Sequence, residues 1–98
     1  MERLHRMDLR HRLGLNVRRL RRDRELSQER LSLLSGLSRA YVSSVETGRR
    51  NATLDTLEIL ARTLGVDGWE LIAVPTELDT EAAPIAAAKK TADNFEDS

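Results

Sequence analysis

Residues 38–51, SRAYVSSVETGRRN, combine hydroxyl and guanidinium groups at spacings that suit contact with a polyanion. The middle of this segment predicts a short helix that begins near Arg39 and is stopped by Gly48. At about 100° per residue, Val42 and Val45 share one side of this helix, which we expect to face the core. The opposite side carries small or hydroxyl-bearing residues and one guanidinium: Arg39, Ala40, Ser43, Ser44 and Thr47.

A helix surface of this kind suits insertion into the major groove of DNA. Small side chains permit close approach, hydroxyls donate or accept hydrogen bonds, and arginine can bind guanine with two donors. The only carboxylate of the helix, Glu46, falls at the edge of the apolar side, where it does not repel phosphates. The alternative is an ordinary amphipathic helix that happens to be rich in serine.

The charge of the chain is distributed unevenly, although the net charge is zero. Residues 1–51 contain 13 arginines and 6 carboxylates, a charge of +7, whereas residues 52–98 contain 3 cations and 10 carboxylates, a charge of −7. A basic half indicates a polyanionic partner. The alternative is a basic surface that is merely solvated.

The elements that must position residues 38–51 are also predicted to be helices. Leu13, Val17 and Leu20 recur at helical spacing and predict a first helix that fades near Arg24. Residues 1–12 form a basic lead-in, which is either a flexible arm or an extension of this helix.

A second short helix is predicted directly before the segment. Ser27 can cap its start, Leu31 and Leu34 form its inner stripe, and Gly36 stops it. Because Ser38 can cap the next helix, the turn between them is only about three or four residues long and contains a glycine. This spacing predicts a helix-turn-helix, in which the second helix is free to protrude.

Two more helices and a tail complete the predicted organisation. Thr53 caps a helix that Gly65 closes, and Asp67 caps a short helix that ends by Pro75. The inner residues of the longer helix are Leu54, Leu57, Leu60, Ala61 and Leu64. The chain is thus predicted to be all-α, with a basic arm at 1–12, a five-helix domain at 13–74 and an acidic, alanine-rich tail at 75–98. We expect the tail to be mobile, with a packed helix as the alternative.

Composition excludes several classes of function. Without cysteine the chain has neither disulfides nor a thiolate metal site, and its apolar runs are too short to span a bilayer. The N-terminus lacks the apolar stretch of a signal peptide, so we expect a cytoplasmic protein. His5 and His11 lie off helical metal spacing and lack a third ligand. No nucleophile, base and orienting group can be assembled, so we expect no enzyme, metal or cofactor.

Residues 13–72 resemble the helix-turn-helix family of phage repressors, Cro proteins and bacterial regulators of the xenobiotic-response-element type. Three stretches carry the resemblance: LGLNVRRLRRDRELSQERL, SGLSRAYVSSVETGRRNATL and DTLEILARTLGV. The segment SRAYVSSVETGRRN is especially similar to restriction–modification controller proteins. The sequence departs from the family where Ser32 and Ser35 replace alanines and where Ala52, not proline, follows Asn51. The resemblance implies a compact, lambda-repressor-like domain.

The resemblance also implies roles for individual residues. Gln28 would clamp a phosphate and brace the helix that follows the turn, and Tyr41 would lie at the groove wall. Base contacts would come from Arg39, Ala40, Ser43 and Ser44, and phosphate contacts from Arg49, Arg50 and Asn51. The full predicted DNA-binding set is Gln28, Ser38, Arg39, Ala40, Tyr41, Ser43, Ser44, Arg49, Arg50 and Asn51.

The resemblance further implies an ion pair between Arg21 and Glu46 that fixes the angle of the helix after the turn. The alternative is that Arg21 is one of several solvated arginines. If the pair serves orientation, we expect Glu46→Gln to weaken DNA binding more than it lowers global stability.

Useful specificity normally requires two copies of such a domain on a two-fold axis. Trp69, Leu71, Ile72 and Val74 are the candidates for a dimer interface, unless they only close the monomer core. The favoured function is therefore a homodimeric, sequence-specific transcriptional regulator that binds double-stranded DNA. The alternatives are an antitoxin-type regulator that binds a protein partner through residues 75–98, and a helical adaptor that does not bind DNA.

Overall fold

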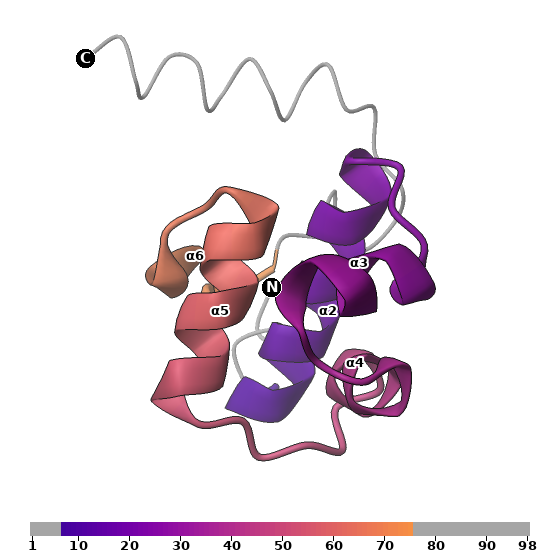
Figure 1. Ribbon diagram of the computed structural model, residues 1–98. Coiled ribbons are helices and arrows are strands. Elements are labelled where there is room, and N and C mark those ends of the chain that lie inside the picture. The colour runs from indigo at the N-terminus through magenta and orange to yellow at the C-terminus, as the bar shows by residue number, and fades with distance from the viewer. Residues whose placement is uncertain (1–6, 76–98) are drawn as a thin grey trace, which may run out of the picture.

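The computed structural model describes residues 7–75, which form five helices and no strand. These are α2 (Leu9–Asp23), α3 (Gln28–Ser35), α4 (Arg39–Glu46), α5 (Leu54–Leu64) and α6 (Gly68–Ile72), shown in Figure 1. The predicted all-α, five-helix class is confirmed. None of these helices is long and apolar enough to cross a membrane. The predictions for residues 1–6 and 76–98, including the mobile tail and its protein partner, lie outside the described residues.

Local capping explains where the helices begin. The side chains of Ser27, Ser38 and Thr53 each accept a hydrogen bond from the backbone three residues ahead, as predicted. At the last helix, Glu70 Oε2 accepts from the backbone N–H of Asp67 at 2.9 Å. Each cap satisfies an N–H that the helix itself leaves without a partner.

The first helix begins earlier than its apolar repeat. Asp8 caps α2 by accepting a hydrogen bond from the His11 backbone N–H at 2.9 Å, so the helix starts at Leu9. Residues 9–12 are therefore the extension of the helix, and the predicted boundary at residue 12 falls inside α2. At the other end, Pro75 is fully buried and belongs to the domain and not to the tail.

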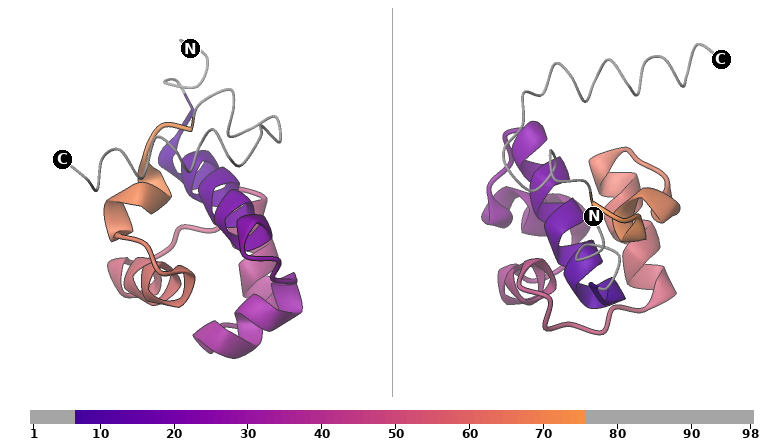
Figure 2. Two further views of the ribbon diagram at one scale, coloured as in Figure 1. Left: turned by 90° about the horizontal axis from the view of Figure 1, so that it is seen from above. Right: turned by 180° about the vertical axis from the view of Figure 1, so that it is seen from behind.

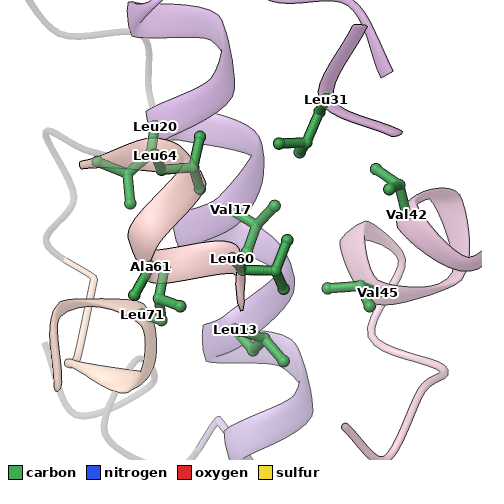
Figure 3. Close-up of a cluster of buried hydrophobic side chains, with 10 residues drawn as sticks. All are labelled: Leu13, Val17, Leu20, Leu31, Val42, Val45, Leu60, Ala61, Leu64 and Leu71. Carbon is green, nitrogen blue, oxygen red and sulfur yellow. The ribbon is translucent and has the colours of Figure 1, made fainter. Parts of the chain in front are cut away.

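Helix α2 lies between two pairs of helices. Figures 1 and 2 show α5 and α6 on one side of α2, with α3 and α4 on the other, and α2 contacts α4, α5 and α6. The core residues of α2 face Leu60 and Leu64 of α5 as well as Val42 and Val45 of α4 (Figure 3). The buried core comprises Leu13, Val17, Leu20, Leu31, Val42, Val45, Leu60, Ala61, Leu64 and Leu71.

The prediction for the inner side of α3 is only half right. Leu31 is fully buried, but the side chain of Leu34 is 50% exposed. The buried and half-buried positions of α3 are Gln28, Leu31, Ser32 and Ser35, which follow the i, i+3, i+4, i+7 pattern of one helix face. The two serines therefore occupy the inner stripe, and Leu34 is turned out of it.

Candidate nucleic-acid interface

The two helices of the predicted helix-turn-helix are α3 and α4. Gly36 ends α3 in the left-handed conformation, with φ of 80°, and its N–H donates to the carbonyl of Ser32. Leu37 continues the turn, and Ser38 caps α4 by accepting from the N–H of Tyr41 at 3.0 Å. Ser32 and Ser35 brace the turn, because the Ser32 hydroxyl donates to the Leu37 carbonyl and the Ser35 hydroxyl accepts from the Leu37 N–H.

Helix α4 has one buried side and one accessible side, as its sequence predicts. Val42 and Val45 are buried against the core. The predicted base-contacting residues lie on the other side: Arg39 and Ala40 are exposed, and Ser43 and Ser44 are half-buried. Exposed residues flank the helix at both ends: Ser38, Arg49, Arg50 and Asn51. Of the predicted set, only Gln28, Tyr41, Ser43 and Ser44 are partly covered.

The structure brings three of the predicted residues together at the edge of α4. The guanidinium carbon of Arg50 lies 4.7 Å from the centroid of the Tyr41 ring. Arg50 Nε donates to Ser44 Oγ at 3.2 Å, and this hydroxyl donates to the Tyr41 carbonyl at 2.7 Å. Tyr41 also packs against the core, so it is a boundary residue between the core and the surface.

Glu46 anchors α4 to the two helices before it. Its side chain is fully buried and accepts from Arg21 twice, with Nε to Oε2 at 2.6 Å and Nη2 to Oε1 at 3.0 Å. Gln28 Nε2 donates to Oε1 at 3.1 Å, and Arg18 Nε lies 3.7 Å from the same oxygen. The structure thus contains the Arg21–Glu46 ion pair, and it places Gln28 as a brace.

Arg21 also fixes the loop between α2 and α3. Its Nη1 donates to the Leu26 carbonyl at 2.8 Å, so one guanidinium joins α2, this loop and α4. Glu25, which directly precedes Leu26 in this loop, adopts the left-handed conformation with φ of 56°. Burial of a carboxylate is costly unless it is paired and hydrogen-bonded, and here the partners come from two different helices.

Sequence reasoning missed Gly14, which determines how closely α2 and α4 approach. A Cβ atom at Gly14 would lie 2.6 Å from the Val45 carbonyl oxygen and 2.7 Å from that of Glu46. Both neighbours are backbone atoms, so neither can rotate away. Glycine in the interior of a helix lowers the stability of that helix. Its presence in the predicted helix was therefore the available signal for a close contact with another helix.

Asn16 is a second residue that sequence reasoning missed. It is buried, and its Nδ2 donates to the carbonyls of Leu71 and Ala73, both at 2.9 Å. These carbonyls lie at the C-terminal end of α6, where helix carbonyls lack intrahelical partners. Asn16 lies on the stripe of Leu13 and Leu20, and a polar residue on an apolar stripe was the signal for such a bond.

The structure divides the four predicted dimer-interface residues. Trp69 is 66% exposed, and Ile72 and Val74 are half-buried. The prediction is wrong for Leu71, whose side chain is fully buried in the monomer core. Leu71 lies on the side of α6 that faces α2 and α5, and it therefore closes the core, which was the alternative for all four residues.

Known proteins share this arrangement. A family model described as Helix-turn-helix matches residues 17–68, which cover the C-terminal part of α2, all of α3, α4 and α5, and the start of α6. The chain belongs to the helix-turn-helix family. The resemblance on which the residue roles were based is thereby confirmed at the level of the family.

Two relatives of this helix-turn-helix protein bear the names of regulatory proteins. It is 49% identical to the HTH-type transcriptional regulator y4dJ of Sinorhizobium fredii, over 72% of this chain and 91% of that protein. It is 52% identical to the control protein C.SmaI of Serratia marcescens, over 67% of this chain and 79% of that protein.

A solved structure of a related protein includes DNA. The restriction–modification controller protein C.Esp1396I, as a tetramer in complex with its natural 35-base-pair operator, aligns with a TM-score of 0.61 at 28% sequence identity. The alignment covers 67% of this chain and 91% of that chain. The helix-turn-helix protein therefore shares its described fold with a controller protein that is bound to its operator.

Proposed function

We propose that the protein is a sequence-specific transcriptional regulator that binds double-stranded DNA as a homodimer, with α4 in the major groove. The observation that carries this proposal is the accessible side of α4. This side carries Arg39, Ala40 and two serines. The only carboxylate of α4, that of Glu46, points inward and is neutralised by Arg21. Such a helix can approach base edges without a large side chain or a negative charge in the way.

The surroundings of α4 supply the second requirement, which is attraction to phosphates. Exposed Arg49, Arg50 and Asn51 follow the helix directly, and residues 1–51 carry a charge of +7. Contacts of this kind position a protein on the duplex but do not read its sequence. The base preference therefore rests on α4, and above all on Arg39.

The homodimer is proposed because one helix-turn-helix reads only a few base pairs. The C.Esp1396I relative, a tetramer on its operator, supports assembly of several copies on DNA. Among the four predicted interface residues, Trp69 is the best candidate for the contact between copies, since its large apolar side chain is 66% exposed. Because the proposed partner is DNA, we expect the protein to act in the compartment that holds DNA, which for a bacterial regulator is the cytoplasm.

A comparison of two arginine variants tests the proposal. A duplex would first be selected from random DNA by the unaltered protein. Fluorescence anisotropy would then measure how tightly Arg39→Ala and Arg62→Ala bind this duplex and each of its single-base-pair variants. Both variants lose one exposed arginine, but Arg62 lies on α5. We expect Arg39→Ala to lose about 1–3 kcal/mol of discrimination at one base pair, and Arg62→Ala to keep it. Equal losses in the two variants would contradict the proposed role of α4.

A further inference from the structure

The N-terminal end of α2 carries a histidine that lies against the loop leaving α4 (Figure 1). The His11 ring packs on Gly48, where a Cβ atom would lie 3.1 Å from ring Cδ2 and 3.3 Å from Nε2. Gly48 adopts the left-handed conformation, with φ of 76°, and has no side chain that would displace the ring. The ring is therefore held at the residue that directly precedes Arg49, the first of the proposed phosphate contacts.

The packing of α2 on α4 explains where the ring lies. His11, Gly14, Arg18 and Arg21 follow one another at i, i+3, i+7 and i+10 along one side of α2. Gly14 lies against two carbonyls at the end of α4, and both arginines face the carboxylate of Glu46. His11 continues this side of α2 to the loop after α4, so its position is set by the contact between the two helices.

Asp8 fixes which ring nitrogen of His11 carries a hydrogen. Its Oδ1 lies 2.8 Å from His11 Nδ1 and accepts the His11 backbone N–H at 2.9 Å. These bonds, the backbone bond first, lower the pKa of Asp8, so its carboxylate is ionised at neutral pH. An ionised carboxylate has no proton to donate, so the hydrogen between the two groups belongs to Nδ1. Nε2 then carries a hydrogen only when the ring is an imidazolium.

The other ring nitrogen is available for a ligand. The side chain of His11 is 58% exposed, and within residues 7–75 its Nε2 has no hydrogen-bond partner. The charged residues around the ring are Asp8, which contacts it, Arg10 and Arg12, which flank it in the sequence, and Arg49 on the facing loop. With a neutral ring, the Asp8 carboxylate is uncompensated and repels a phosphate. Protonation neutralises the pair and changes Nε2 from an acceptor into a donor.

We propose that His11 is a pH-dependent contact to a DNA phosphate, in which the imidazolium Nε2–H donates to a phosphate oxygen beside the loop of residues 49–51. This inference rests on the proposed function and adds a contact on α2 to those of α4 and its loop. Affinity for DNA then rises as the pH falls through the range in which imidazole gains a proton, about pH 8 to 5. Where the ring is neutral in the free protein, each copy takes up one proton from solvent when it binds.

The pH and salt dependence of binding tests the role of His11. Fluorescence anisotropy would measure affinity for the selected duplex at about pH 5.5 and about pH 8.5, near the two ends of the imidazole range, at several salt concentrations. We expect the unaltered protein to bind about tenfold more tightly per copy at the lower pH, the effect of one charge-assisted hydrogen bond. The salt slope should also be steeper by about one per copy. The same affinity and salt slope at both pH values would overturn the proposal.

Three variants separate the charge of His11 from its packing. His11→Gln and His11→Lys both lose the ring that packs on Gly48, but only lysine is a cation at both pH values. We expect His11→Gln to bind at both pH values as weakly as the unaltered protein does at the higher one. His11→Lys should bind at both as tightly as the unaltered protein does at the lower one. Equal weakening in the two variants would show that the ring serves packing alone and would overturn the proposal.

His5→Gln is the matched control, because it removes the other histidine of the chain. We expect this variant to keep the pH dependence of the unaltered protein. Loss of that dependence in His5→Gln would place the proton elsewhere and also overturn the proposal. Circular dichroism melting at both pH values confirms that each variant is folded.

The failure of this inference is distinguishable from failure of the proposed function. If the unaltered protein selects no sequence, the proposed function itself fails. If the protein selects an operator and binds it with one affinity and one salt slope at both pH values, the function stands and only the role of His11 is wrong.

Discussion

Arg21 donates two hydrogen bonds to the carboxylate of Glu46, from Nε to Oε2 at 2.6 Å and from Nη2 to Oε1 at 3.0 Å. The carboxylate is fully buried, so it has exchanged water for these donors and for Gln28. The pair joins the first helix of the domain to the helix that we propose reads DNA. A change at this pair therefore acts on both the stability of the fold and the angle of α4.

The first prediction concerns Glu46→Gln, which keeps the shape of the side chain and removes its charge. The sequence alone led us to expect a larger loss of DNA binding than of stability. Burial changes this expectation, since the variant leaves the Arg21 charge unpaired in the interior. We expect the free energy of unfolding to fall by about 3–5 kcal/mol, as measured by urea titration.

The double variant Arg21→Met/Glu46→Met separates orientation from stability. Replacing both members of a buried ion pair with apolar residues is often neutral or stabilising. We expect this variant to regain much of the stability that Glu46→Gln loses but to bind the selected duplex more weakly than the unaltered protein. Full recovery of affinity together with stability would show that the pair does not orient α4.

The second prediction concerns the contact between α2 and α4. Gly14→Ala would normally stabilise a helix by up to about 1 kcal/mol. Here the new Cβ would come within 2.7 Å of two backbone carbonyl oxygens, so the helices must separate. We expect the free energy of unfolding to fall by about 1–3 kcal/mol. Gly68→Ala is the matched control, because a Cβ there meets nothing within 4 Å, and it should not destabilise the protein.

Gly14 and Asn16 mark the limit of what the sequence could predict. The caps at Ser27 and Ser38 depend on neighbours three residues away, so local patterns suffice to find them. Gly14 and Asn16 act on backbone atoms of other helices, and nothing near them in the sequence identifies those atoms. The sequence marks each as unusual in its helix but cannot name its partner.

Hydrophobicity was also an incomplete guide within single helices. Leu34 was predicted to face the core because it is apolar and three residues from Leu31, yet the inner stripe continues through Ser32 and Ser35. Their small size lets α3 approach the turn, where both hydroxyls bond to Leu37. The same limit explains Leu71: an apolar stretch near the end of a domain does not reveal which residue turns inward.

The third prediction concerns Asn16, whose amide group binds two carbonyls of the α6 end. Asn16→Asp preserves size but places a carboxylate against the carbonyl oxygens of Leu71 and Ala73. We expect a loss of at least about 2 kcal/mol at neutral pH, because two buried acceptors lose their donors. A protonated aspartic acid can donate one bond, so the loss should be smaller at acidic pH. A loss that does not depend on pH would contradict this account.

The fourth prediction concerns the pH dependence of the first helix. The pKa of Asp8 lies below its ordinary value, because its carboxylate accepts hydrogen bonds from the His11 backbone N–H and then from the His11 ring. A lowered pKa in the folded state means stability that is present above the unfolded pKa, near 3.8, and lost as the pH falls through the folded value.

Thermal melting of Asp8→Ala at several pH values checks this dependence. We expect a lower melting temperature than in the unaltered protein at pH 7, and the same melting temperature at pH values below the lowered folded-state pKa, where Asp8 is protonated. Ser27→Ala is the control, because its cap does not ionise and its cost should stay constant over this pH range. A gap that persists unchanged for Asp8→Ala at low pH would contradict the assigned cap.

The most direct test of the central claim is selection of bound sequences from a pool of random duplex DNA by the full chain at moderate salt. The account predicts enrichment of a two-fold symmetric consensus whose half-sites are centred about 34–36 Å apart or a multiple of this distance. It also predicts that Arg39→Ala loses a base preference at symmetry-related positions of that consensus. No enrichment by the folded, unaltered protein would contradict the proposal that α4 reads DNA, and an asymmetric single site would contradict the homodimer.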